Sequence, residues 1–438
     1  MRFVLALTVI LITSVVFLPF LIKHNGTARM FSQVLLTYSL SILTAVMAAS
    51  TLWLGCAAIA NDLEAGQLQL LAVKPVSRWQ IWLGKWLGIM AVQSIVLAVA
   101  GGSAFAALYW HAARLAPEEQ TKLRQEILVA RGSLRETPPD LTVDTEKLAG
   151  RRRKQIDLAA VSPELIRRQV ASEVKALHET VTPNYRRVWT LDPGWRRALV
   201  RELPMALRVH FYAAQKSEDG IYRTVWIAGD EKSPTAFRRE MLLTAGTTHE
   251  FVIPPNLLSA DGKLTILCEN RSPATLLFRL EDGLELLFQE GSFGANYSRG
   301  LLVIWCWMAL IAAMGVTAGT FLSFPVATLL VVSLFLAGLS GETFAEVVRE
   351  GTVSSLDHET GRPEGSLFDW LFVPMSRVFT LLIGPVEKVS PIAALSSGRS
   401  IPWAQVAVAA GQVGLVFGGT VAVIGMIIFT RREISRPS

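Results

Sequence analysis

Five charged side chains stand in a short segment between two long apolar runs of this 438-residue chain. They are spaced over residues 62–85 and are Asp62, Glu64, Lys74, Arg78 and Lys85. Charged groups are costly in hydrocarbon, so the segment must emerge from any membrane that the flanking runs cross. It is too short for a domain, but its spacing suits a helix, a proline break and a second helical start. Such an element is suited to passing force to a protein docked on the membrane surface.

Motifs for nucleotide, nucleophile or metal chemistry are absent from the sequence. The Gly-Lys pairs at 84–85 and 262–263 lack the rest of the G-x-x-x-x-G-K-[ST] phosphate loop, and no G-x-S-x-G string occurs. The three cysteines and six histidines have no disulfide or metal spacing. We therefore expect no catalytic residue, no cofactor and no metal. If ATP drives this protein, another chain must hydrolyse it.

An ordered pattern runs through the charged segment: an acidic-x-Glu-x-Gly-x-Leu start, a leucine pair, a Pro-Val-Ser-Arg string and a later Gly-Lys. The positions are Asp62, Glu64, Gly66, Leu68, Leu70, Leu71, Pro75, Val76, Ser77, Arg78, Gly84 and Lys85. This pattern resembles the cytoplasmic loop of ABC-2 type transporter permeases, and the Phe-Thr-Arg-Arg-Glu run at 429–433 resembles the family's ending. The chain departs from the family in entering the membrane directly after Arg2 and in carrying a large insert.

The resemblance implies that the loop is a coupling element that contacts a separate cytoplasmic ATPase. The candidate coupling residues are Asp62, Glu64, Gly66, Leu68, Lys74, Pro75, Ser77, Arg78 and Lys85. The first two would lie near the ATPase, and the Pro-Val-Ser-Arg string would turn the chain into the next span. The alternative is an ordinary charged loop, in which Pro75 and Arg78 only end one helix and anchor the next at the headgroups.

Composition indicates a membrane protein with a soluble insert. Hydrophobic residues make up 51% of the chain and charged residues 18%, and the charge is concentrated in the middle. The net charge of +6 is spread over several segments, so no nucleic-acid partner is expected. A span needs about 20 mostly apolar residues. The six expected spans are residues 3–22, 35–60, 86–110, 300–321, 323–341 and 403–430, the first of which could instead be a signal peptide.

Positive charge predicts the orientation. The 62–85 loop and the C-terminal tail with Arg431, Arg432 and Arg436 both lean positive, which places them in the cytoplasm. The insert, residues 111–297, then lies outside. Residues 366–386 are apolar but interrupted by charges and prolines. We interpret them as a re-entrant or interfacial helix in an outer segment, 342–402. A seventh span is the alternative.

The insert has two parts. Residues 111–204 have a helical pattern, with an apolar face in the second half. Residues 205–297 alternate apolar and polar side chains between three Asp-Gly pairs, as antiparallel hairpins do. The expected strands are 206–214, 221–229, 249–254, 263–269, 275–280 and 284–289, which suggests a β-sandwich or jelly-roll-like fold.

The sequence thus predicts an α-helical polytopic membrane protein with an extracytoplasmic α+β insert. Gly315 and Gly319 form a GxxxG pair, which serves either packing within the chain or a dimer seam. The predicted function is the permease subunit of an ABC-2 type exporter in a bacterial cytoplasmic membrane. Its partners would be an ATPase subunit, a second permease subunit (identical or related) and membrane lipids. The alternatives are a membrane scaffold or signal-transmitting protein that senses through the insert, and a membrane-anchored enzyme with its site there.

Overall fold

The chain forms two compact units in a computed structural model. The described residues are 28–67, 76–137, 139–153, 163–217, 219–231, 233–339, 341–351, 369–387 and 390–432, together with Ala6 and Thr13. The helical unit consists of Met1–Ala130 and Gly291–Ser438, and the insert is Arg131–Glu290. The insert therefore starts later than the sequence suggested, because the short helix α5 (Pro117–Glu126) still packs with the helical unit.

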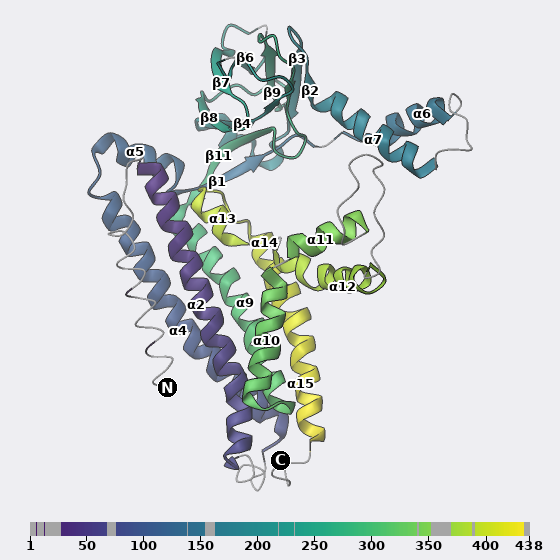
Figure 1. Cartoon of the computed structure of the whole chain (residues 1–438). Coiled ribbons are helices and arrows are strands. Elements are labelled where there is room, and N and C mark those ends of the chain that lie inside the picture. Colours follow the sequence, from purple (N-terminus) through teal and green to yellow (C-terminus); the bar gives the residue numbers. More distant parts are fainter. Residues whose placement is uncertain are drawn as a thin grey trace. The chain divides into compact units, whose positions relative to one another are not determined.

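Four helices among the described residues are long and apolar enough to cross a membrane (Figure 1). They are α2 (Ala28–Glu64), α4 (Arg78–Ala112), α9 (Phe293–Phe321) and a last helix at Trp403–Arg431. The last one is built from α14 (Trp403–Val408), a π-helical stretch η2 (Ala409–Gly418) and α15 (Gly419–Arg431). Four of the six expected spans are thus long apolar helices.

The remaining helices of this unit are shorter. The expected span 323–341 contains α10 (Phe324–Leu339), whose 16 residues rise about 24 Å. It is followed by α11 (Gly341–Glu350), α12 (Asp369–Glu387) and α13 (Pro391–Ser396). Within the segment 366–386, residues 369–386 are helical as expected, but α12 is not among the described helices that qualify as spans. Apart from Ala6 and Thr13, the expected span 3–22 lies outside the described residues, so the count of six stays a prediction.

The helical unit has two ends, which we call the loop end and the insert end. At the loop end, Lys85 of α4 pairs with Asp62 of α2, and Arg432 donates to the carbonyl of Thr320 in α9. The insert end includes the start of α9, where Asn296 binds the backbone of Arg399 and Ile401. The insert leaves the helical unit at Ala130 and returns at Gly291, on this side. Because α9 ends at the loop end, the chain must return to the insert end before Pro391.

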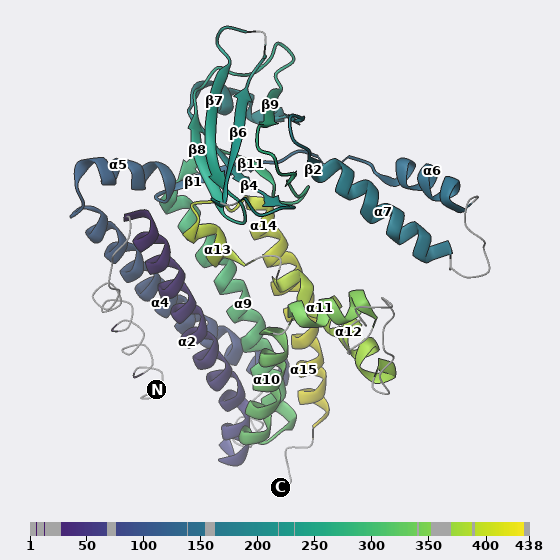
Figure 2. The same ribbon diagram turned by 45° about the horizontal axis from the view of Figure 1, so that its top comes forward.

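The described strands of the insert form two four-stranded sheets and one small sheet (Figure 2). The first has the order β1 (Val129–Leu134), β11 (Leu284–Ser292), β4 (Met205–His210), β8 (Thr248–Ile253). The second has the order β3 (Arg186–Leu191), β9 (Leu264–Asn270), β6 (Ile221–Ala228), β7 (Phe237–Thr244). The small sheet has the order β2 (Thr180–Val181), β10 (Leu276–Leu277), β5 (Tyr212–Ala213).

Both four-stranded sheets contribute side chains to one apolar core. The rings of Trp189 and Trp226 stack at 5.9 Å, and Phe278 meets both edge-on. Helices α6 (Thr142–Arg153) and α7 (Pro163–Glu179) pack on each other through a separate small cluster, and α8 (Arg197–Glu202) follows a 3-10 turn, η1 (Gly194–Arg196). The fold is therefore a helical membrane protein with a β-containing insert. A sandwich or jelly-roll connection stays a prediction.

The helical description of residues 111–204 is wrong in part, because β1, β2 and β3 come from this region. These strands have weak local signals: β1 contains arginine, glycine and serine, and β3 begins with two arginines. They are strands because of partners far along the chain, as Trp189 opposite Ile266 in β9 shows. The strand β7 was also missed, since three charges lie in its first half and it bonds only to β6.

Candidate coupling site

The first element of the coupling site is the end of α2. The amides of Ala65 and Gly66 donate to the carbonyls of Asn61 and Leu63 at 2.9 and 3.2 Å, and Gly66 then has φ +67°. This left-handed conformation is cheap for glycine and ends helices. The conformation at the end of α2 therefore explains why a glycine stands at position 66 of the predicted site. Glu64 is exposed beside it. The predicted residues Leu68, Lys74 and Pro75 lie outside the described residues.

The second element is the start of α4. Ser77 has the extended conformation of an N-cap, and its amide donates to the side-chain oxygen of Gln80 at 3.1 Å. The amide of Gln80 in turn donates to the carbonyl of Ser77 at 3.0 Å. A serine followed three residues later by glutamine is the usual capping pattern. The predicted turn into the next span therefore ends here, with Arg78 as the first helical residue.

The predicted residues Asp62 and Lys85 lie together. The ammonium group of Lys85 is 2.5 Å from a carboxylate oxygen of Asp62, and the side chains are 35% and 20% exposed. An ion pair this exposed contributes at most about 1 kcal/mol to stability. Its consequence is mainly geometric, because it ties the last turn of α2 to the third turn of α4 across the loop.

Arg78 caps the C-terminal end of α15. Its Nη1 atom lies 3.2, 2.9 and 2.6 Å from the carbonyl oxygens of Phe429, Thr430 and Arg432. The last carbonyls of a helix have no partner within the helix, so the guanidinium supplies the missing donors. Arg78 therefore has a structural task at this end of the unit in addition to its charge. The loop and the C-terminal end of the last helix lie at the same end of the unit, as the charge pattern suggested.

Arg432 repeats this arrangement at the end of α9, where its Nη1 donates to the carbonyl of Thr320. In the sequence, Arg432 stood out only as part of the positive tail and of the run 429–433. A basic residue immediately after a helix end was the available signal, since such residues often bind the last carbonyls. What the sequence could not show is that the carbonyls belong to a neighbouring helix.

A mixed polar and apolar surface remains open at the loop end. Glu64, Ser77 and Gln80 are exposed, and Val76 and Trp79 are 42% and 48% exposed. Trp79 was not singled out from the sequence, although tryptophan is common at membrane interfaces and at protein contacts. This surface is the part of the site that a soluble partner could contact.

Gly315 and Gly319 are used within the chain. A Cβ atom at Gly315 would lie 2.9 Å from the Cα of Gly55, and one at Gly319 would lie 2.8 Å from the carbonyl oxygen of Cys56. The two glycines thus let the backbones of α9 and α2 approach closely. Of the two roles considered for this pair, these contacts favour packing within the chain.

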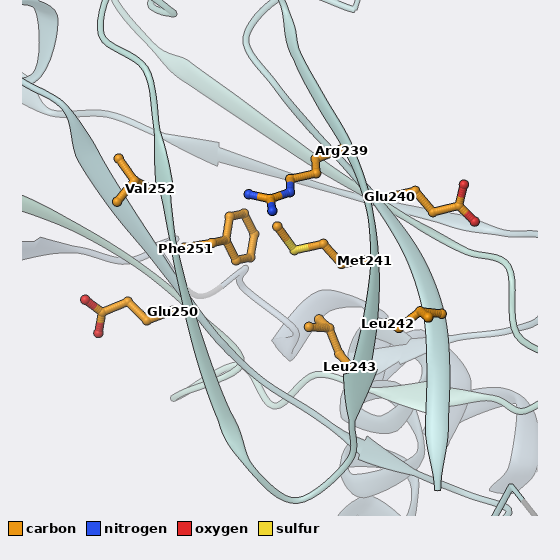
Figure 3. Close-up of a pocket in the computed structure, with 8 residues that line it drawn as sticks. All are labelled: Arg239, Glu240, Met241, Leu242, Leu243, Glu250, Phe251 and Val252. Carbon is orange, nitrogen blue, oxygen red and sulfur yellow. The ribbon is translucent and has the colours of Figure 1, made fainter. Parts of the chain in front are cut away.

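A second candidate site is an open groove in the insert (Figure 3). It lies between β7 and β8, which are edge strands of the two different sheets. Its volume is about 700 Å³, and Figure 3 shows Arg239, Met241, Leu243 and Phe251 pointing into the space between the strands. The lining combines apolar side chains with one cation, Arg239, and two carboxylates, Glu240 and Glu250.

Comparison with known proteins supports the permease interpretation. Residues 2–121 match the family model of the ABC-2 family transporter proteins, a segment that contains α2, the loop and α4. No curated protein and no solved structure matches the chain. The chain is therefore a multi-pass membrane protein that resembles the ABC-2 type transporter permeases, and the resemblance is confirmed for residues 2–121.

Proposed function

We propose that this chain is the membrane-spanning permease subunit of an ABC-2 type ATP-driven exporter that relies on a separate ATPase subunit. The observation that carries the proposal is the family match over residues 2–121, which includes the loop. The contacts of the loop fit this role. Its two ends are tied to α2, α4 and α15, so a push on the exposed surface would reach three helices.

Charge supports a cytoplasmic position of the loop end. This end carries four basic residues: Arg78, Lys85, Arg431 and Arg432. Short segments with an excess of lysine and arginine are retained in the cytoplasm. The insert is attached to the opposite end of the helical unit, at Ala130 and Gly291. We therefore place the insert outside and the chain in a bacterial cytoplasmic membrane.

A second permease subunit completes the proposed exporter. In the last helix, Trp403–Arg431, only 22% of the most apolar stretch is buried within the chain, whereas 67% of the corresponding stretch of α9 is buried. Leu415, Val423 and Ile424 are among its exposed side chains. Lipids and a second subunit, identical or related, are the partners proposed for this face.

The groove between β7 and β8 favours one alternative function. An open groove of about 700 Å³ is within the size range of ligand sites, so the insert could sense a molecule while the loop signals and no solute moves. In such a scaffold or signalling protein, the loop end would have no ATPase partner. The two functions therefore differ in a measurable association.

Charge reversal at Glu64 tests the proposal. Glu64 is exposed at the loop end, and Glu118 of α5 is exposed at the insert end, so Glu64→Lys and Glu118→Lys make the same charge change at opposite ends. Exposed substitutions of this kind usually change stability by within about 0.5 kcal/mol. We expect both variants to insert normally, Glu64→Lys to lose its co-purifying ATPase subunit, and Glu118→Lys to keep it.

The measurement is affinity purification of the full chain from native membranes, with the ATPase activity of the eluate as the readout. A wild-type chain that captures no ATPase would leave the scaffold function as the better explanation. Equal capture by wild type and both variants would remove Glu64 from the contact surface and leave the loop without its assigned role.

A further inference from the structure

We propose that Arg78 is a positioning residue that makes the last helix follow the coupling loop. This inference rests on the proposed function and adds where the movement goes. Arg78 is both the residue at which the loop ends and the residue that holds α15, because its Nη1 donates to the carbonyls of Phe429, Thr430 and Arg432. The two N–H groups of one nitrogen are thus shared among three acceptors in a single turn.

The held turn of α15 is itself anchored in the core. Phe429 is fully buried, so its carbonyl belongs to a fixed part of the helix and not to a frayed end. A tie to such a point can transmit displacement. A tie to a mobile tail could not.

A second contact lies one helical turn along α4. Trp82 is buried, and a Cβ atom at Gly425 of α15 would lie 2.9 Å from its indole nitrogen. Residues 78 and 82 are on the same face of α4, since side chains four apart in a helix are neighbours. Contacts at two levels fix the direction of α15 as well as its position, so the start of α4 and the end of α15 must move as one body.

The connection extends to α9 through Arg432. The carbonyl of Arg432 accepts from Arg78, and its guanidinium donates to the carbonyl of Thr320 at the end of α9. Thr317 of α9 also donates to the carbonyl of Val421 in α15 at 3.1 Å. Two arginines in series therefore join the ends of α4, α15 and α9, whereas Asp62–Lys85 joins α2 to α4 separately.

Arg78→Ala removes the tie and leaves Glu64 and Trp79, the exposed surface proposed for the partner, intact. The matched control is Arg431→Ala. Arg431 is exposed in the same turn, so its loss removes the same charge without touching the three carbonyls. Arg78→Lys keeps the charge but replaces the planar guanidinium with a single ammonium, and serves as the second variant if Arg78→Ala folds poorly.

The experiment is hydrogen exchange of the full chain, in complex with its co-purifying ATPase subunit, with and without ADP and vanadate. In wild type and Arg431→Ala, we expect the nucleotide state to change exchange in residues 61–67 and in residues 419–431. In Arg78→Ala, the change in residues 61–67 should persist and the change in residues 419–431 should be lost. Arg78→Lys should show a reduced change in residues 419–431.

A purely structural cap would give a different result, because its loss would speed exchange of the last turn equally in both nucleotide states. Equal acceleration in both nucleotide states, which leaves the nucleotide response of residues 419–431 unaltered in Arg78→Ala, would overturn the inference. Loss of that nucleotide response in Arg431→Ala would overturn it as well. A wild-type complex whose residues 61–67 do not respond to nucleotide would overturn the proposed function and this inference with it.

Discussion

At the scale of single residues, Arg78 shows what sequence can and cannot reveal. Its charge, its place after the proline and its spacing from Glu64 could be read directly, and they predicted a helix start at the membrane surface. Its partners could not be read, because the bonded carbonyls lie 351 to 354 residues further along the chain. Hydrogen bonds to a charged group contribute about 1.5–3 kcal/mol each when well formed, so this missing information concerns a large interaction.

Gly315 provides a prediction about packing. A Cβ atom there would meet the backbone of Gly55, which cannot move aside as a side chain can, whereas one at the exposed Gly102 of α4 would meet no atom within 4 Å. We expect Gly315→Ala to destabilise the helical unit by about 1–3 kcal/mol, the usual cost of overpacking, and Gly102→Ala to be neutral or slightly stabilising.

Thermal unfolding of the full chain in detergent, followed by size-exclusion chromatography, measures the difference. Equal melting temperatures for the two variants would show that α2 and α9 are not in backbone contact at Gly315. An increase in melting temperature for Gly315→Ala would contradict the close approach outright.

At the scale of elements, predictions succeeded where one local signal was enough. Long apolar runs gave α2, α4 and α9, and strands near Asp-Gly pairs were found because Gly220 and Gly262 adopt the positive φ that such turns require. They failed for β1, β3 and β7, whose strand conformation depends on distant partners. The span expected at 323–341 contains the apolar helix α10.

The helix α7 carries a pH-dependent contact. Lys175 lies 2.5 Å from Glu281, and this hydrogen bond, followed by one to the amide of Glu281, holds the pKa of Glu281 below its ordinary value. The same bond to Glu281 raises the pKa of Lys175. The depressed carboxyl pKa stabilises the contact above the unfolded pKa of glutamate, about 4.3, and that stabilisation is lost as pH falls through the lower folded pKa.

Acidification from pH 7 to below the usual glutamate range should therefore loosen α7, by an amount limited to about 1 kcal/mol because Glu281 is 54% exposed. Hydrogen exchange of residues 163–179, corrected for the intrinsic pH dependence, measures this. In Glu281→Gln, hydrogen exchange of residues 163–179 should increase less on acidification than in wild type. In Glu231→Gln, which breaks the exposed pair with Arg186, it should increase as in wild type. Identical acid responses in both variants would remove Glu281 as the cause.

At the scale of the whole molecule, the two ends of the helical unit decide the topology. The loop and the end of α15 are joined by Arg78, so they must face the same side of a membrane. Between the loop and the point where the insert begins, α4 is the one described helix long enough to cross a membrane, so we expect the insert on the other side. Sequence charge predicted the same relation, but through a bias in Lys and Arg and not through contact.

Cysteine labelling tests this topology in intact cells. Labels at Ser77 and Thr430, which are both exposed at the loop end, should react only when a reagent can enter the cytoplasm, and a label at the exposed Lys216 of the insert should react with an impermeant maleimide. Wild type is the background control. Its three cysteines, Cys56, Cys268 and Cys306, are all buried, and burial raises the pKa of the Cys268 thiol in the insert, so wild type should label little from either side. Labelling of Ser77 and Thr430 from opposite sides would contradict the Arg78 contact, and labelling of Ser77 and Lys216 from the same side would mean that α4 does not cross the membrane.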